Sequence, residues 1–241
     1  ADSLGVDIIN SSLGYTTFND SLENHNYSDM DGNTTIVTKA ADWAASKGIL
    51  VVNSAGNSGN GSWHYIGAPA DADSILTIGA VAYDSAKASF SSFGPTFDGR
   101  VKPTVAARGL NAYVIDAEGE RSTANGTSFS SPIIAGAVAC LWQAYPNETN
   151  MNIIDYVQRY SHQADSPDSL LGYGIPNLYN AYLELENRNY FVPQEYIDVY
   201  PNPITNKFTI KYFSQGKKPV ELAIFDILGR NHGLIYDDIL R

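Results

Sequence analysis

The sequence predicts an α/β fold in which helices cover a mostly parallel sheet, followed by a small antiparallel β unit. Residues 6–10 (VDIIN) and 49–52 (ILVV) read as short buried strands, and a helical pattern lies between them. A strand–helix–strand unit implies a right-handed crossover and parallel pairing. From about residue 187 the pattern changes to the period-two alternation that is typical of antiparallel strands.

The helix expected over residues 36–45 places Ile36, Ala40, Trp43 and Ala44 on one face, and Gly48 supplies its end. The elements that follow are predicted from apolar runs and periodicity. They are strands at 75–81 and 112–115, an extended segment at 101–106, helices at 151–157 and 178–186, and strands at 197–200, 207–212 and 220–225.

The stretch 125–138 reads NGTSFSSPIIAGAV and predicts a loop entering a buried helix that runs to about Tyr145. Pro132 suits a first turn, and Ser128 would then lie at the mouth of the helix. Free N–H groups and the helix dipole favour negative charge there. A serine at this place can act as a nucleophile whose developing oxyanion meets its own N–H, and an N-cap serine is the alternative interpretation.

The residues GTSFSSP, followed by Ala135 and Gly136, resemble the nucleophile motif of the subtilisin-like (subtilase) serine peptidases. This resemblance implies a three-layer α/β sandwich around a mostly parallel sheet, with the N-terminal strands of that fold missing from these residues. It assigns the nucleophile role to Ser128. It also makes Asn57, in the segment SAGN, the side-chain donor to the oxyanion, whereas a turn asparagine is the alternative.

The same resemblance assigns a set of substrate-binding residues. Ser12, Leu13 and Gly14 resemble the subtilase segment that pairs with an extended substrate and lines the primary specificity pocket. Ala55 and Gly56 would line that pocket, with Gly67 at its floor. These positions carry no charge, so the pocket is expected to accept medium-to-large apolar side chains.

The catalytic acid and base of subtilases precede the Ser-Leu-Gly segment, in the order Asp, His, Ser. That segment begins here at Ser12, and none of the histidines has the family's His-Gly-Thr-His context; they are His25, His64, His162 and His232. His64 is interpreted as a structural or rim residue. The pair is therefore expected upstream of residue 1, and the chain alone is expected to be inactive. Residues 6–10 are expected either to form an open sheet edge or to pair with another chain or a further segment.

Two domains are predicted, a catalytic portion at 1–187 and a β-rich unit at 188–241. The phrases VYPNP at 199–203 and IFDILGR at 224–230 resemble the C-terminal sorting domain of type IX secretion cargo in Bacteroidetes-type bacteria. The resemblance implies the type IX secretion machinery as a partner and a secreted or cell-surface protein. A small β-sandwich accessory is the alternative, and the final strands of a sorting domain are not apparent after Arg230.

Composition narrows the possible partners. The net charge of -11 argues against nucleic acid and anionic membranes, and no apolar run reaches the length of a membrane span. The single cysteine, Cys140, is expected to be a small buried side chain. Asp71 and Asp73 can join carbonyls around calcium, but a solvated acidic loop is the simpler interpretation, and no metal or cofactor is predicted.

Two functions follow from these patterns. The first is a secreted endopeptidase that acts on polypeptides through an acyl-enzyme. The second is a non-catalytic, subtilase-like surface protein used for binding. Retention of both Asn57 and Ser128 favours the enzyme, since a binding module has no use for an oxyanion site.

Overall fold

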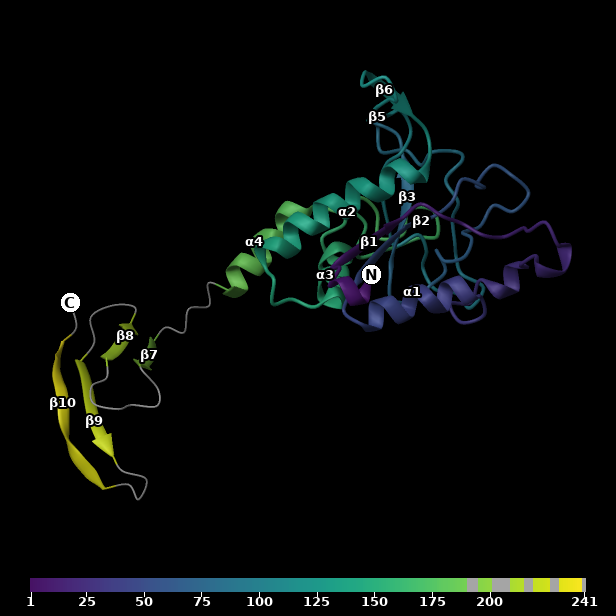
Figure 1. Cartoon of the computed structure of the whole chain (residues 1–241). Helices are drawn as coiled ribbons and strands as arrows, with labels where there is room; N and C mark the ends of the chain where they lie inside the picture. Colours follow the sequence, from purple (N-terminus) through teal and green to yellow (C-terminus); the bar gives the residue numbers. More distant parts are fainter. Residues whose placement is uncertain (190–194, 201–208, 215–218, 226–229, 240–241) are drawn as a thin grey trace. The chain divides into compact units, whose positions relative to one another are not determined.

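The computed structural model (Figure 1) describes residues 1–189, 195–200, 209–214, 219–225 and 230–239. The chain divides into two compact units, Ala1–Glu184 and Leu185–Arg241. The first unit contains the parallel sheet and the candidate site.

A four-stranded parallel sheet forms the centre of the first unit, in the order β1-β2-β3-β4. Its strands are β1 (Ile8–Ser11), β2 (Leu50–Ser54), β3 (Leu76–Val81) and β4 (Val105–Arg108). Helices α1 (Ile36–Ser46) and α2 (Thr127–Ala144) lie on opposite sides of the sheet (Figure 1). Helix α3 (Asn150–Arg159) follows α2, and α4 is Leu178–Asn189; single 3-10 turns occur at Asp2–Leu4, Ser21–Glu23 and Tyr27–Asp29. The predicted α/β fold with a parallel sheet is confirmed.

Strand β1 forms one edge of this sheet. Ile8 pairs with Leu50 and Asn10 with Val52, and among the described residues β1 has no strand on its other side. The open edge expected from the sequence is therefore confirmed. It is an apolar edge whose outer N–H and C=O groups are available for pairing.

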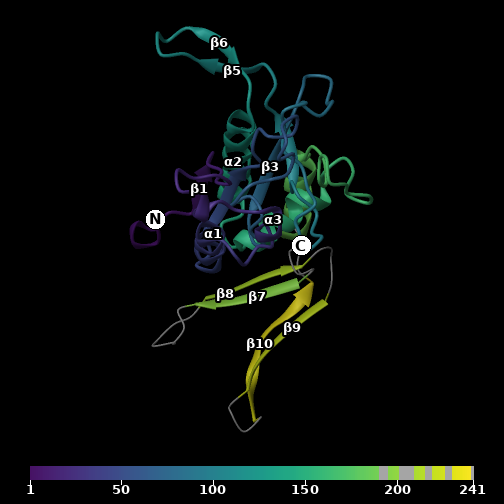
Figure 2. The same ribbon diagram turned by 90° about the vertical axis from the view of Figure 1, so that its right-hand side faces the viewer.

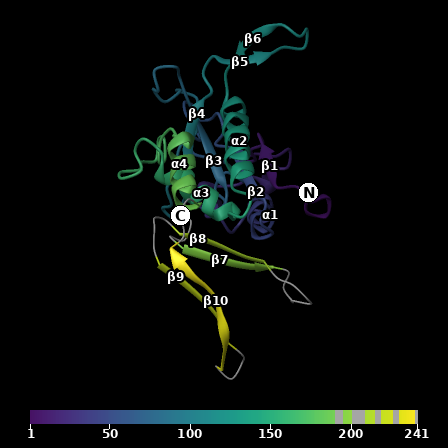
Figure 3. The same cartoon turned by 90° about the vertical axis from the view of Figure 1, so that its left-hand side faces the viewer.

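A β-hairpin made of β5 (Ala112–Ile115) and β6 (Arg121–Ala124) links β4 to α2 and projects beyond the sheet (Figures 2 and 3). At its base, the Arg108 guanidinium lies 5.5 Å from the ring centre of Tyr83 and 5.2 Å from that of Tyr113. Strand β6 was not predicted, because the sequence RSTA has no apolar alternation. These residues form a strand because they pair with β5.

The buried face of α1 matches the predicted one only in part, since Ala44 packs against the core. Ile36 is 84% exposed and Trp43 is 68% exposed, whereas Thr38 and Ala45 are buried. Small side chains on the buried face let α1 approach the sheet closely. The Thr38 hydroxyl also donates a 2.6 Å hydrogen bond to the buried Asp71 carboxylate, which holds this face inward. The core beneath α1 consists of Ile49, Val51, Ala72 and Ile75, with Ile9, Ala41 and Ala44 packed against it.

Two expectations for α2 were wrong. The helix begins at Thr127, so Pro132 lies beyond the first turn. Cys140 is exposed rather than buried, because the residues of α2 that pack inward are on another face of the helix. Those inward residues include Ile134, Val138 and Leu141.

The described strands of the second unit form two antiparallel pairs. Strand β7 (Glu195–Tyr200) pairs with β8 (Thr209–Ser214), and β9 (Pro219–Phe225) pairs with β10 (Asn231–Ile239). No strand was anticipated after Arg230. The reason is that β10 has register irregularities between Asn231 and Gly233 and between Leu234 and Tyr236, which interrupt the period-two pattern. Residues 201–203 and 226–229 of the two sorting phrases lie outside the described residues.

Candidate functional site

Ser128 is the second residue of α2 and is half-buried. Its main-chain N–H has no acceptor within the helix, since the first N–H groups of a helix extend beyond it. Its main-chain carbonyl would normally accept from the N–H of residue 132, but Pro132 has none. The Ser12 hydroxyl donates to that carbonyl over 3.3 Å. Ser128 is thus placed by the helix start and tied to the end of β1.

Asn57 lies beside Thr127, the neighbour of Ser128. Its Oδ1 accepts from the Thr127 N–H at 2.9 Å and from the Thr127 hydroxyl at 3.0 Å. The same hydroxyl accepts from the Gly56 N–H at 3.2 Å. Because two donors occupy Oδ1, the free end of the Asn57 amide is the Nδ2 donor. The loop after β2 and the start of α2 are therefore fastened together through Thr127.

Gly126 precedes the helix in a backbone conformation that L side chains rarely adopt, with φ at 150°. Its N–H donates to the Gly109 carbonyl at 2.8 Å. A Cβ on Gly126 would lie 3.5 Å from Asn57 Nδ2 and 3.6 Å from the Phe129 ring. A glycine here keeps the space beside the Nδ2 donor open.

A pocket of about 210 Å³ opens next to Ser128. It collects residues from the ends of β1 and β2, from the loops that follow them and from the start of α2, and none of the described residues that line it is charged. The lining residues are Ser12, Leu13, Gly14, Thr16, Ser54, Gly56, Asn57, Ser58, Trp63, Tyr65, Gly67, Ser92, Thr127 and Ser128. Of the residues assigned from the sequence, Ala55 alone does not line this pocket. It is 1% exposed and packs with Ile66 and Ala70, so it supports the wall from behind.

Two aromatic residues of the pocket wall were not singled out from the sequence. The Trp63 indole N–H donates to the Ile66 carbonyl at 3.1 Å, and the Tyr65 ring stacks on Tyr27 at 4.0 Å between ring centres. Tyr27 in turn donates to the Pro95 carbonyl at 2.8 Å, and burial raises the pKa of its hydroxyl. The signal that could have identified Trp63 and Tyr65 is their position in the sequence, between the predicted site residues Asn57 and Gly67.

No histidine lines the pocket among the described residues. His64 is exposed, has a positive φ of 62° and stacks against Phe93 with 6.2 Å between ring centres. His162 is engaged elsewhere, since its Nδ1 accepts from the Ile175 N–H at 2.7 Å. Among the described residues, the pocket therefore holds Ser128 and the Asn57 amide without a histidine beside them.

Asp71 was expected in a solvated loop, and that was wrong. Its carboxylate is buried and accepts from Gly32 N–H at 3.0 Å in addition to Thr38. Desolvation raises the pKa of Asp71. Asp73 forms an ion pair with Arg100 at 2.5 Å, and Arg100 also donates to the Asp71 carbonyl. Among the described residues no group of three or more His, Cys, Asp or Glu side chains is placed to hold a metal.

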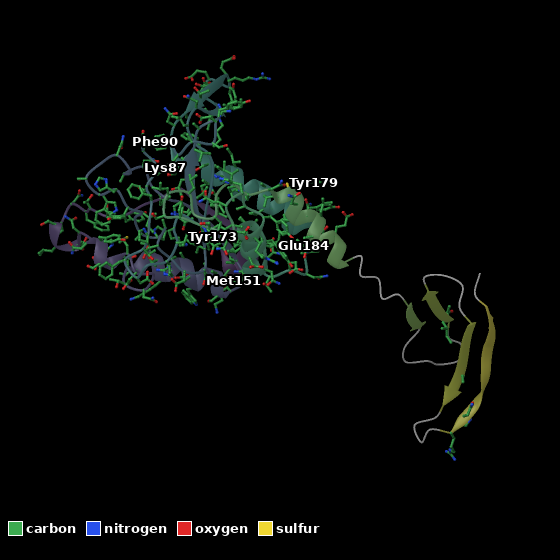
Figure 4. All side chains as sticks on the ribbon, turned by 180° about the vertical axis from the view of Figure 1, so that it is seen from behind. Lys87, Phe90, Met151, Tyr173, Tyr179 and Glu184 are labelled. Carbon is green, nitrogen blue, oxygen red and sulfur yellow. The ribbon has the colours of Figure 1, made fainter. Side chains whose placement is uncertain are left out.

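Two lysines near the sheet are desolvated. Lys102 is 4% exposed and donates to the Ile75 carbonyl at 3.2 Å and the Thr77 hydroxyl at 3.1 Å. Burial lowers its pKa to about 7. Burial also lowers the pKa of Lys87, labelled in Figure 4, whose ammonium lies 5.0 Å from the centre of the Phe93 ring. Neither lysine lines the pocket beside Ser128.

Comparisons with known families match two parts of the chain. Residues 2–174 match the model of the subtilase family of peptidases. Residues 198–232 match the model of the secretion system C-terminal sorting domain. Within the described residues, no helix has the length and apolar character needed to cross a membrane.

Similar proteins include several subtilisins. Subtilisin DY of Bacillus licheniformis is 37% identical over 59% of this chain and 44% of its own length. Subtilisin NAT of Bacillus subtilis subsp. natto is 35% identical over 66% of this chain and 36% of its own. The chain thus spans less than half the length of these curated relatives.

Solved structures with a similar fold include a protease domain and a maturation protease. The self-cleaved protease domain of PatA has a TM-score of 0.60 at 22% identity, over 77% of this chain and 64% of the other. The prenylagaramide maturation protease PagA has a TM-score of 0.59 at 22% identity, over 76% of this chain and 63% of the other. At this level of identity the likeness concerns the fold.

Proposed function

The chain belongs to the subtilase family, and from this premise we propose that it carries the nucleophile and the oxyanion site of a secreted serine endopeptidase. The observation that carries the proposal is the arrangement of Ser128 at the start of α2 with Asn57 fixed beside it through Thr127. This arrangement supports catalysis over the binding-protein alternative, because it orients a hydrogen-bond donor that simple binding does not require.

In the proposed reaction, Ser128 Oγ attacks the carbonyl carbon of a substrate peptide bond, and the hydroxyl proton passes to a histidine. The carbonyl oxygen becomes an oxyanion that accepts from the Ser128 N–H and from Asn57 Nδ2. The intermediate collapses to an acyl-enzyme as the histidine protonates the leaving amine, and water then releases the acid. Asn57 and the helix start stabilise charge only when it develops, which is what accelerates the chemical step.

The histidine and its aspartate partner are proposed to come from protein sequence outside residues 1–241. Two observations support this: no histidine lines the described pocket, and the chain spans 36% to 44% of the two subtilisins compared above. The 241-residue chain alone is accordingly proposed to be inactive, because a serine hydroxyl without a base is a poor nucleophile.

Polypeptides are the proposed substrates. An extended substrate would pair with the main chain of Ser12, Leu13 and Gly14, and the side chain before the cleaved bond would enter the uncharged pocket that Gly67 lines. Leu13 is 57% exposed at this edge, so it is accessible to a substrate.

Export is proposed to use the type IX secretion machinery of a Bacteroidetes-type bacterium. The match of residues 198–232 to a secretion system sorting domain supports this route and a secreted or cell-surface location. The match covers a part of the chain separate from the peptidase region at 2–174.

The proposal is tested with the full-length protein by measuring hydrolysis of a protein substrate and of peptide amides. Ser128→Ala should lower kcat by about 10⁴-fold or more, and Asn57→Ala by about 10²–10³-fold with a smaller effect on KM. Far-ultraviolet circular dichroism of each variant controls for folding. Wild-type activity that survives Ser128→Ala would contradict the proposal.

A further inference from the structure

A buried asparagine, Asn53, lies near the C-terminal end of β2, in register with Ser11 of β1 and Thr77 of β3. All five residues of β2 are buried, and Asn53 has an exposed fraction of 0%. Val51 and Val52 precede it in the strand, and their apolar side chains are typical of a fully buried strand. A polar amide in this environment costs free energy unless its groups find hydrogen-bond partners.

The Asn53 amide is only partly satisfied. Its Nδ2 donates to the Leu13 carbonyl at 3.3 Å and to the Ser54 carbonyl at 2.7 Å, so two acceptors fix the orientation of the amide. Its Oδ1 is buried and has no hydrogen-bond partner among the described residues. An apolar side chain of the same shape would avoid this unpaired acceptor. Stability of the strand therefore does not explain an asparagine here.

The hydrogen bond from Asn53 to the Leu13 carbonyl gives a reason for an asparagine at this position. Leu13 is the central residue of the exposed segment of residues 12–14, which lines the pocket. One end of the segment is tied to α2 by the hydrogen bond from the Ser12 hydroxyl to the Ser128 carbonyl. Just past the other end, Tyr15 N–H donates to the Ala68 carbonyl at 2.8 Å. Between these anchors Asn53 holds the centre of the segment from the core.

Holding the Leu13 carbonyl inward has a consequence for its neighbours. In an extended chain, successive main-chain carbonyls point to opposite sides. We infer from this alternation that a Leu13 carbonyl held toward Asn53 directs the carbonyls of Ser12 and Gly14 to the opposite side, where a substrate would pair. An extended substrate can pair with the main chain of Ser12 and Gly14 only while their carbonyls keep this direction.

We propose that Asn53 is a positioning residue for substrate: it fixes the Leu13 carbonyl so that the main-chain groups of Ser12 and Gly14 stay aligned to pair with an extended peptide. The role rests on the proposed function for its kinetic effect, but the binding effect is independent of turnover. Asn53 touches neither the nucleophile nor the oxyanion donor in the described contacts, so it acts through Leu13 alone.

The variant Asn53→Leu tests the role, because leucine is close to asparagine in shape and cannot donate. In the full-length protein, kcat/KM for a hexapeptide amide should fall by about tenfold, mainly through KM, as expected for loss of one hydrogen bond. Hydrolysis of a small p-nitrophenyl ester, which has no extended peptide main chain to pair with residues 12–14, should change by less than about threefold. The thermal midpoint should change little, because removal of the unpaired Oδ1 offsets the loss of the two hydrogen bonds from Nδ2.

Val52→Ala is the matched control, because it weakens the core of the same strand and leaves the hydrogen bond from Asn53 to Leu13 in place. It should lower the thermal midpoint and leave the ratio of peptide to ester hydrolysis unchanged. An Asn53→Leu variant with unchanged KM for the hexapeptide, or with equal losses on both substrates, would overturn the role of Asn53.

A binding measurement separates this role from the proposed activity. In a Ser128→Ala background, calorimetry of the hexapeptide should show about tenfold weaker affinity when Asn53→Leu is added. If the wild type hydrolyses nothing but this loss of affinity appears, the proposed function fails and the role of Asn53 stands. If affinity is unchanged, the role of Asn53 is wrong whatever the activity.

Discussion

The Ser12 hydroxyl donates a hydrogen bond to the main-chain carbonyl of Ser128, a distance of 3.3 Å across 116 residues of sequence. The carbonyl is available because Pro132 cannot make the helical hydrogen bond to it. A second link joins the same elements, from the Ser131 hydroxyl to Asn10 Oδ1 at 2.8 Å. The end of β1, where a substrate is proposed to pair, and the start of α2 therefore form one connected unit.

Thr127 should orient the Asn57 donor. Thr127→Val removes the hydroxyl that joins the Gly56 N–H to Asn57 Oδ1, while the Thr127 N–H still contacts Oδ1. We expect kcat of the full-length enzyme to fall about 5- to 30-fold, the scale of one or two lost hydrogen bonds, with KM within about twofold. Thr127→Ser keeps the hydroxyl and should stay within about threefold of the wild type. Equal losses in both variants would contradict this role of the hydroxyl.

The pocket should select medium-to-large apolar side chains before the cleaved bond, because none of the described residues that line it is charged. Gly67→Val tests this: a Cβ at Gly67 would lie 3.0 Å from Thr16 Cγ2, so a larger side chain there must fill the pocket or displace Thr16. In a peptide library, cleavage after Phe and Leu should fall more than about tenfold relative to cleavage after Ala.

Gly61→Ala is the control for that substitution, since Gly61 does not line the pocket and its added Cβ would lie 3.4 Å from the Ser58 carbonyl. Its cleavage profile should match that of the wild type. A wild-type profile dominated by Lys, Arg, Asp or Glu would contradict the uncharged pocket.

Lys102 should make stability depend on pH in the alkaline range. Its pKa in the folded chain is about 7, against 10.5 for an unperturbed lysine, so between these values the unfolded chain binds more protons than the folded one. The free energy of unfolding should therefore rise with pH from about 7 to about 10. Near Lys102, Arg100 favours the neutral amine, whereas Asp42, Asp71 and Asp73 favour the charged form.

Lys102→Met should flatten this rise, because methionine fills similar space without a titrating group. Guanidinium unfolding at pH 7, 8.5 and 9.5 measures the slope in both proteins. Parallel slopes for wild type and Lys102→Met would show that Lys102 is not the source.

The open edge of β1 should be the least protected part of the sheet in the 241-residue chain. Ile8 also borders an apolar hollow of about 290 Å³, which Asp7, Ala139 and Trp142 help to line. We expect faster amide hydrogen exchange in β1 than in β3, which is paired on both sides. The subtilase resemblance implies further N-terminal strands, and if they cover this edge in the full-length protein, exchange in β1 should slow there. Identical rates in the two proteins would contradict this covering.

Local patterns predicted most of the first unit. The strands over residues 49–52, 75–81 and 112–115 and the helix after Ser128 form near their expected bounds, because each combines an apolar run with clear end signals. The partly wrong face of α1 arose because periodicity identifies apolar positions but not how closely the helix packs. Ala41 and Ala45, rather than Trp43, permit the close approach.

The sequence predicted less of the candidate site than of the fold. The resemblance of the segment SAGN to the subtilase motif indicated Asn57. The Thr127 hydroxyl that fastens Asn57 joins positions 70 residues apart, and a pattern of spacing cannot reveal such a contact. The inward Leu13 carbonyl and its Asn53 donor depend likewise on tertiary structure. Buried Asp71 looked like a loop residue because its partner Thr38 is 33 residues away.

The measurement that tests the central claim most directly is covalent labelling of the full-length protein with a fluorophosphonate, followed by mass spectrometry of the peptide that contains residue 128. The account predicts one adduct, on Ser128, formed about 10²–10³-fold more slowly in Asn57→Ala because the phosphonyl oxygen loses a donor. Ser128→Ala should give no adduct. A protein that hydrolyses peptides while Ser128 stays unlabelled, or that is labelled at another serine, would contradict the assignment of Ser128 as the nucleophile.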